Sequence, residues 1–282
     1  MKTKCSCLLS LALIAPVSLG LLSGCGGGTR DQKANEETAD SISQEFTLSP
    51  EARNLLYEFP TPFEVTTLLE QAKAGYIFDI TNSVSNVGKY ITEKSKAISL
   101  GVYSADLAYS ATYNYIDETN KFLGCTSKLA DELGIAGVYQ PDLIEKVKKF
   151  NHNKDSLVAL VSKVFLMTND FLSKNNRNQV AVYIASGAFV EGLYLASSLN
   201  IVAKDNTLIS GIIYKQQPNF DRLLSILNLY QQDVTIKSVY DEVLKLKPVF
   251  TDFGLETGKK IPQDKANKIN DVVESVRNTF IR

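Results

Sequence analysis

Histidine and tryptophan are almost absent from this chain of 282 residues, which has one histidine and no tryptophan. The single histidine, His152, lies in a polar run that we interpret as a solvated loop between two helices. One copy cannot form the paired-histidine signature of helical zinc proteases or the Glu-x-x-His pairs of di-iron bundles. The sequence therefore leans against an enzyme, and we predict no catalytic residue, no metal site and no cofactor.

The N-terminus carries an apolar run from Leu8 to Leu22, preceded by Lys2 and Lys4. Positive charge before a short apolar segment is typical of an export signal, and the run is short for a permanent membrane span. Its end, Leu22-Ser23-Gly24-Cys25, resembles the lipobox of bacterial lipoproteins. The resemblance implies cleavage before Cys25 and lipidation of Cys25 with more than one acyl chain, which gives a stable anchor. An uncleaved anchor is the alternative.

Cysteine is too scarce for a disulfide framework. Of the four cysteines, Cys5 and Cys7 belong to the leader and Cys25 to the anchor, so Cys125 stands alone in the folded part. Stability must then come from the burial of apolar side chains, for which the chain is long enough. Because no histidine lies near Cys125 in the sequence, we interpret it as a buried small hydrophobe rather than a nucleophile.

Neither sign of charge is in large excess. The formal net charge is −1, and it becomes −3 once Lys2 and Lys4 leave with the leader. A chain without a basic surplus is a poor general binder of nucleic acid. The predicted partners are a membrane, through the lipid anchor, and an envelope protein or a small-molecule ligand, with no nucleic acid among them.

The sequence divides into three parts. Residues 1–24 form the predicted signal peptide, residues 25–48 the lipidated cysteine with a polar tether, and residues 49–282 a helical domain. The tether has too few large apolar side chains to fold, and as a random coil it spans about 25 Å. In enterobacterial lipoproteins an Asp after the lipidated cysteine retains the protein in the inner membrane. Gly26 occupies that position here, so the resemblance favours the outer membrane.

Beyond the tether the hydrophobic periodicity is helical almost throughout. Pro50 and Pro62 each follow a hydroxyl-bearing residue, which is typical of a helix start, and Glu64 would complete a capping box with Thr61. We also expect Asn153 to cap a helix. The sequence predicts an all-α fold, a single multi-helix bundle or array of antiparallel helices with about eight to ten helices.

Residues 179–199 leave almost no polar face, so we expect them to form a central, buried helix. Further helices are expected over residues 220–230, 236–253 and 266–280, the second bent at Pro248. An unbroken three-four spacing runs from Val102 to Leu133 and extends back to Val84. A helix of that length would exceed the size of a compact domain, so we place a kink or break near Gly101.

Two acids, Asp106 and Glu191, stand in otherwise apolar helical segments. A buried carboxylate is costly unless it meets a donor or a cation. In one interpretation the acids hold core helices in register by bonding to tyrosine or lysine. In the other they form the floor of a polar pocket for a small ligand or an oxygen-loving cation. The candidate ligand-binding residues are Asp106, Glu191, Tyr103, Tyr109 and Tyr194, and Gly101, Gly187 and Gly192 would let the helices approach closely.

A faint similarity links residues 98–103 with residues 184–189, each followed by one of these acids. Chance produces such pairs readily in apolar helices, so a duplicated helical hairpin is the less favoured interpretation.

Residues 60–64, 100–109 and 191–194 read Pro-Thr-Pro-x-Glu, Leu-Gly-Val-Tyr-x-x-Asp-Leu-Ala-Tyr and Glu-Gly-Leu-Tyr. These segments resemble those of uncharacterised helical lipoproteins of the Bacteroidota, a likeness that implies placement in the cell envelope and a helical fold but brings no activity. We expect a lipid-anchored, non-catalytic protein that binds a partner protein or small ligand near the membrane. The alternatives are a carboxylate-dependent metal-binding protein or enzyme that uses Asp106 and Glu191, and a structural envelope spacer.

Overall fold

The computed structural model describes residues 49–57, 59–139, 145–147, 149, 153–203, 206–256 and 258–282. The predicted leader, the lipidation site Cys25, the tether up to residue 48 and the lone histidine His152 lie outside the described residues.

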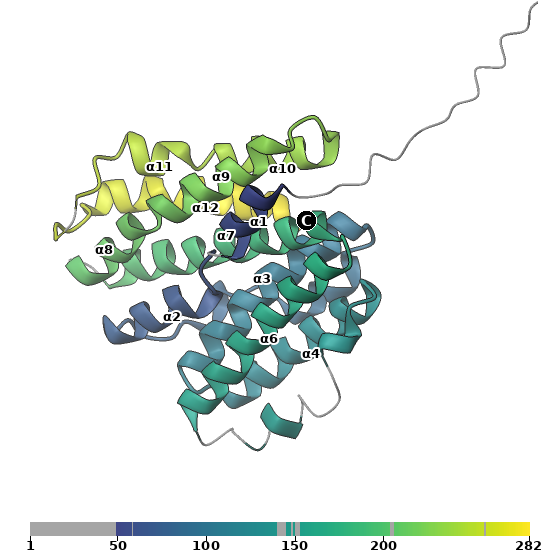
Figure 1. Ribbon diagram of the computed structural model, residues 1–282. Coiled ribbons are helices and arrows are strands. Elements are labelled where there is room, and N and C mark those ends of the chain that lie inside the picture. Colours follow the sequence, from purple (N-terminus) through teal and green to yellow (C-terminus); the bar gives the residue numbers. More distant parts are fainter. Residues whose placement is uncertain are drawn as a thin grey trace, which may run out of the picture. The chain divides into compact units, whose positions relative to one another are not determined.

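The all-α prediction is confirmed, because the described residues form eleven α-helices and no strand (Figure 1). The helices are α1 (Pro50–Tyr57), α2 (Pro62–Gln71), α3 (Glu93–Thr112), α4 (Ile116–Glu132), α6 (Lys154–Lys174), α7 (Asn178–Val202), α8 (Thr207–Lys215), α9 (Gln217–Leu229), α10 (Val234–Leu244), α11 (Lys247–Thr251) and α12 (Gln263–Phe280). Three short 3-10 helices, η1 (Phe78–Ile80), η2 (Val84–Lys89) and η3 (Ala136–Val138), lie in the connections.

Helices α3 and α7 form the centre of the fold. Every residue of α3 from Ala97 to Thr112 is buried, and so is every residue of α7 from Val180 to Asn200. Helices α4 and α6 lie on one side of this pair, and α9, α10 and α12 on the other (Figure 1). The predicted central helix at residues 179–199 is therefore confirmed as α7.

Two glycines set the distance between α3 and α7. A Cβ atom added to Gly101 would lie 2.0 Å from the carbonyl oxygen of Ile184, and one added to Gly187 would lie 2.0 Å from the carbonyl oxygen of Ile98. Real side chains do not tolerate such distances, so only glycine permits this crossing. The two similar segments at 98–103 and 184–189 thus pack against each other reciprocally. The predicted close approach is confirmed for Gly101 and Gly187, whereas a Cβ on Gly192 would meet Val65 at an ordinary 3.8 Å.

The break predicted near Gly101 is wrong, because α3 runs through Gly101 and ends at Thr112. The chain turns at Asn114, whose φ of 60° is left-handed. The N–H of Tyr115 donates to the carbonyl of Ser110 at 2.9 Å, and that of Asn114 to the carbonyl of Ala111 at 3.1 Å. This is the Schellman pattern of a helix end, and the apolar spacing continues across it into α4. Periodicity alone therefore conceals the break.

Most of the predicted helix starts are confirmed. Pro50 and Pro62 begin α1 and α2, and the side chain of Asn153 accepts a hydrogen bond from the N–H of Ser156 at 2.9 Å. The capping box predicted for Thr61 and Glu64 is wrong, because the Thr61 side chain makes no capping bond. The N–H of Glu64 is bound instead by the carbonyl oxygen of Thr61 at 3.0 Å.

The predicted helix over residues 236–253 is two helices. Helix α10 ends at Leu244 and α11 begins at Lys247, with Pro248 in its first turn. Proline lacks the N–H that would continue the hydrogen-bond ladder of α10, which explains a break where a bend was expected.

By length and composition alone, two helices among the described residues are able to cross a membrane, α6 and α7. The whole apolar window of α7 is buried inside the protein. Its apolar character is therefore accounted for by its place in the core.

We expect Gly101→Ala to lower the free energy of unfolding by at least about 3 kcal/mol, because the new methyl group would meet backbone atoms that cannot move without separating α3 from α7. Gly124→Ala is the matched control. Gly124 is exposed on α4, and a methyl group added there would have nothing within 4 Å, so alanine should stabilise the protein by about 0.5–1 kcal/mol. Urea unfolding followed by circular dichroism measures both, and equal effects would contradict the proposed role of the crossing.

Candidate functional site

The structure brings the two predicted acids together. Asp106 lies five residues after Gly101 on α3, and Glu191 four residues after Gly187 on α7, so both follow the crossing by about one helical turn. Their carboxyl groups lie close enough to interact electrostatically, and both side chains are fully buried. Helices α3 and α7 therefore run in the same general direction. In an antiparallel pair, Asp106 and Glu191 would lie on opposite sides of the crossing and far apart.

A third buried group, Arg277 of α12, neutralises this pair. Its Nε donates to Oε2 of Glu191 at 2.6 Å and its Nη2 to Oε1 at 2.8 Å, a bidentate ion pair. The guanidinium also lies 4.2 Å from the centre of the Tyr194 ring, and Nη2 donates to the carbonyl oxygen of Ile80 at 3.2 Å. Fixed donors in this planar geometry match a carboxylate closely. The Glu191 carboxylate raises the pKa of Arg277, against the lowering effect of burial, so the guanidinium stays charged.

The proton balance of Asp106 follows from its surroundings. Its Oδ2 accepts a hydrogen bond from the N–H of Asn82 at 3.1 Å, while no donor among the described residues serves Oδ1. Burial, and then the negative charge of Glu191, hold the pKa of Asp106 well above its usual value, although Arg277 and the Asn82 N–H act in the opposite direction. A protonated Asp106 that donates to Glu191 satisfies both carboxyl groups. One Arg, one carboxylate and one neutral acid then carry no net charge.

The predicted tyrosines do not bond to the acids. Tyr103 donates through its hydroxyl to the carbonyl oxygen of Ser83 at 2.8 Å, and the Tyr109 hydroxyl accepts from the N–H of Ile77 at 2.9 Å. Burial raises the pKa of both hydroxyls, which keeps them neutral donors. Tyr194 meets the cluster only through the face of its ring on Arg277.

These bonds share one target, the segment 75–90 in the connection from α2 to α3, which contains η1 and η2. Its backbone groups at Ile77, Ile80, Asn82 and Ser83 are bound by side chains of α3 and α12. Short 3-10 helices leave many backbone groups without an internal partner, so the buried ones must find partners elsewhere. The candidate residues 103, 106 and 109 are spaced by three along α3, so one face of that helix supplies the partners.

The geometry therefore supports the first interpretation of the acids, in which they hold core elements together, with arginine in place of the expected tyrosine or lysine. Arg277 occupies the position that a cation would need beside Glu191. Within the described residues, no group of three or more His, Cys, Asp or Glu side chains is placed to hold a metal ion. The metal-binding alternative gains no support from this arrangement.

Arg277 was not predicted, although the sequence carries a signal for it. The buried residues of α12 follow a three-four spacing through Ala266, Ile269, Val273 and Phe280, and Arg277 lies three residues before Phe280 on that stripe. An arginine on the apolar face of a helix requires a buried anion. Two such anions, Asp106 and Glu191, were already evident in the sequence.

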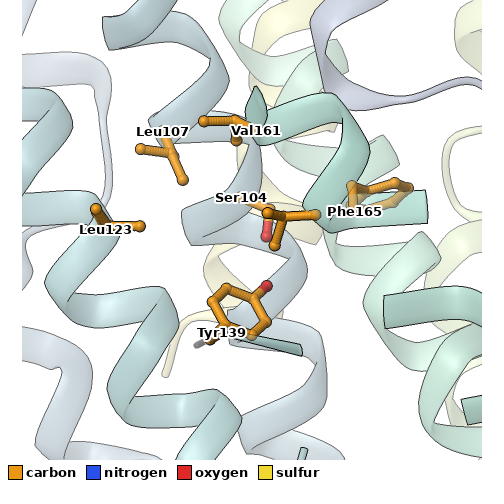
Figure 2. Close-up of a pocket in the computed structure, with 7 residues that line it drawn as sticks. Ser104, Leu107, Leu123, Tyr139, Val161 and Phe165 are labelled. Atoms are coloured by element: carbon orange, nitrogen blue, oxygen red, sulfur yellow. The ribbon is translucent and has the colours of Figure 1, made fainter. Parts of the chain in front are cut away.

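The cavities of the described part of the chain that we measured are small. The one in Figure 2 lies between α3, α4 and α6, where the Tyr139 ring reaches toward Ser104, and has a volume of about 10 Å³, room for one water molecule. A second, beside Phe59 and Phe189, holds about 20 Å³, and a third, beside Lys265, about 180 Å³. Sites for drug-sized ligands typically enclose about 300–1,000 Å³.

An exposed group of aromatic rings lies at the C-terminal end of α3. The Tyr76 ring is stacked between Tyr109, at 4.4 Å, and Tyr115, at 4.2 Å, and Phe78 packs edge-on against Tyr76 and Tyr115, at 4.9 Å from each. Phe78 is 52% exposed and Tyr115 39% exposed. We name Tyr76, Phe78, Tyr109, Tyr113 and Tyr115 the aromatic platform. Its rings come from two separate stretches of the chain, 76–78 and 109–115, so no single pattern in the sequence indicates it.

The buried hydroxyls of Tyr76 and Tyr113 have no hydrogen-bond partner among the described residues. Buried hydroxyls in native proteins are usually satisfied, by protein or by water. The aromatic platform thus combines exposed ring surface with two donors that the described part of the chain leaves unused.

Glu191→Gln should lower the free energy of unfolding by about 3–5 kcal/mol, because it leaves the Arg277 charge buried without a counter-ion. The double variant Glu191→Gln with Arg277→Met should recover most of that loss, since a neutral amide then faces an apolar side chain. A double-mutant cycle in urea measures the coupling. Additive losses would contradict the ion-pair assignment.

Asp106→Asn tests the proton on Asp106. A folded-state pKa raised above the unfolded value of about 3.9 stabilises the protein fully below that value, and the contribution is lost as pH rises through the folded-state pKa. The stability of the unsubstituted protein, relative to Asp106→Asn, should therefore fall as pH increases, with a slope of up to about 1.4 kcal/mol per unit. Parallel stability curves for the two proteins at every pH above about 4 would rule out a raised pKa for Asp106.

Cys125 should resist alkylation in the folded protein. It is buried on α4, and burial raises the pKa of its thiol to about 11, with a further contribution from the charge of Asp106. At about pH 8 the reactive thiolate is therefore rare. Iodoacetamide should modify Cys125 slowly in the native state and quickly in guanidinium, as followed by mass spectrometry. Equal rates in both states would contradict the predicted burial.

The chain matches no protein-family model, no curated protein and no solved structure. The geometry of the described residues and the sequence pattern of the leader are thus the basis for assigning a function.

Proposed function

We propose that this chain is a lipid-anchored, non-catalytic cell-envelope protein that binds a partner protein through the aromatic platform. The leader pattern and the lipobox resemblance at Leu22 to Cys25 support the anchor, and Gly26 after the cysteine favours the outer membrane. The aromatic platform is the observation that supports binding, since tyrosine and phenylalanine side chains supply much of the energy of protein interfaces.

The construction of the aromatic platform suits a binding surface. Its rings hold one another by stacking and edge contacts, so little side-chain entropy remains to be lost when a partner binds. Phe78 and Tyr115 expose ring surface to water. Burial of that surface against a partner is favourable. A macromolecular partner fits better than a small ligand, because the measured cavities are small and lie away from these rings.

The chemistry of Asp106 and Glu191 argues in the same direction. Both acids are sealed in the core, and Arg277 satisfies the charge that would otherwise be available to substrate or metal. We therefore assign them to the stability of the binding domain.

The anchor is tested by mass spectrometry of the protein from the membrane fraction. The expected N-terminal peptide begins at an acylated Cys25, and Cys25→Ala should leave an unacylated protein that keeps its leader. An unacylated mature protein in the cytosol would refute the proposed anchoring.

The aromatic platform is tested by quantitative cross-linking in the native envelope. We expect the double variant Phe78→Ser with Tyr115→Ser to reduce the yield of a specific cross-linked partner by at least about tenfold, because the two exposed rings of the platform are lost. Leu208→Ser removes an equally accessible apolar side chain, 64% exposed, at the start of α8, and should leave the yield unchanged. Circular dichroism confirms the fold of both, and equal yields would refute the assignment.

A further inference from the structure

The starts of three helices meet at one end of the domain. Arg177, just before α7, pairs with Glu93 at the start of α3 at 3.3 Å. Lys94 donates to Ser238 of α10 at 2.9 Å, and Gln179 of α7 donates to Thr235 of α10 at 2.9 Å. The first turns of α3, α7 and α10 therefore lie together, and we name this the near end of the domain.

The near end carries the most exposed aliphatic side chains among the described residues. Ile91, immediately before the Thr92 cap of α3, is 82% exposed, and Val234, the first residue of α10, is 80% exposed. Leu229, at the end of α9 in the turn that leads to Val234, is 47% exposed. These side chains stand out from the domain, and apolar groups in such positions gain by leaving water.

The described chain also begins at the near end. The N–H of Ser49 donates to the hydroxyl of Tyr230 at 2.6 Å, and Tyr230 directly follows Leu229. Cys25 stands 24 positions before Ser49 in the sequence, and a polar coil of that length spans about 25 Å on average. A chain anchored at Cys25 therefore brings this end within reach of the bilayer.

Charged side chains accompany the apolar ones. Lys89 and Lys94 flank Ile91 by two and three positions, and the acidic Glu93 and Asp233 lie two positions from Ile91 and one from Val234. Lysine beside an aliphatic residue suits the boundary between anionic headgroups and acyl chains, because the aliphatic group enters the boundary while the ammonium group remains at the level of the phosphates.

The opposite end of the domain holds the aromatic platform. Helix α3 runs from Glu93 to Thr112, and 20 helical residues span about 30 Å. The start of α8 lies at this far end too, since Asn206 donates to the carbonyl oxygen of Ala72, close in sequence to Tyr76. Leu208 therefore provides an exposed aliphatic residue at the far end for comparison with Val234 at the near end.

We propose that the near end, presented by Ile91, Leu229 and Val234, docks on the lipid surface that holds the anchor. This inference rests on the proposed lipidation of Cys25. It sets the orientation of the domain: the apolar near end lies in the headgroup boundary, and the aromatic platform points away from the membrane toward the partner.

The test uses the full lipidated protein in vesicles of anionic and neutral phospholipid that contain a nitroxide-labelled lipid. An environment-sensitive fluorophore is placed on Ile91→Cys, Val234→Cys or Leu208→Cys, in separate proteins. The buried Cys125 and an acylated Cys25 leave the introduced thiol as the reactive one. We expect the labels at Ile91 and Val234 to be quenched at least about twofold more strongly than the label at Leu208, as for side chains inserted in the interface.

A matched pair of substitutions separates docking from mere proximity to the tether. With the label at Ile91, Val234→Asp should reduce quenching to the level of the Leu208 label, whereas Leu208→Asp should leave it unchanged, because only the first places a charge in the docking surface. Both positions are exposed, so neither substitution should disturb the fold.

The outcomes separate the two proposals. Equal quenching at both ends, stronger quenching at Leu208, or no effect of Val234→Asp would overturn the docking inference while leaving an acylated, partner-binding protein intact. Mass spectrometry of the same preparations reports acylation. Protein without acyl chains would overturn the anchoring in the proposed function and the docking together.

Discussion

The crossing of α3 and α7 at Gly101 and Gly187 is the constraint on which the rest of the structure depends. Backbone lies against backbone there, which brings the following helical turns close enough for the carboxyl groups of Asp106 and Glu191 to interact. With any larger residue at the crossing the helices would separate, and each acid would be left as a buried charge or an unsatisfied group. The pairing of Asp106 with Glu191 is thus possible only because α3 and α7 approach so closely at Gly101 and Gly187.

Arg277 supplies the positive charge that the buried pair of acids needs, and so links α12 to α7. A buried ion pair seldom adds stability by itself, but breaking one is expensive, so the cluster favours the single arrangement in which α12, α7 and the segment 75–90 all meet. The Glu191 carboxylate uses both oxygens on Arg277, while Asp106 binds the Asn82 N–H and has its pKa held well above its usual value by burial and by the charge of Glu191. Conformational specificity is what such an arrangement can provide.

Much of the fold was predictable from the sequence because burial leaves a strong pattern. The buried α7 and the Asn153 cap of α6 followed from composition and spacing. Asp106 and Glu191 were found for the same reason, as charges where none is expected. The turn at Asn114 was missed because a left-handed residue leaves the apolar spacing of its neighbours intact. A glycine inside a helix, such as Gly101, has two explanations, a break or a close approach, and only the position of the partner helix decides between them.

The aromatic platform was not predictable for a related reason. Tyr76 and Phe78 belong to the connection between α2 and α3, whose path is fixed in part by the bonds that Tyr109, Asp106, Tyr103 and Arg277 make to its backbone. The surface that we assign to binding and the buried cluster that we assign to stability are therefore mechanically linked. Because α3 and α7 pack backbone to backbone at their crossing, a partner held at the far end keeps a fixed height above whatever surface holds the near end. A tethered protein with a looser centre would carry its binding surface at no defined distance from the membrane.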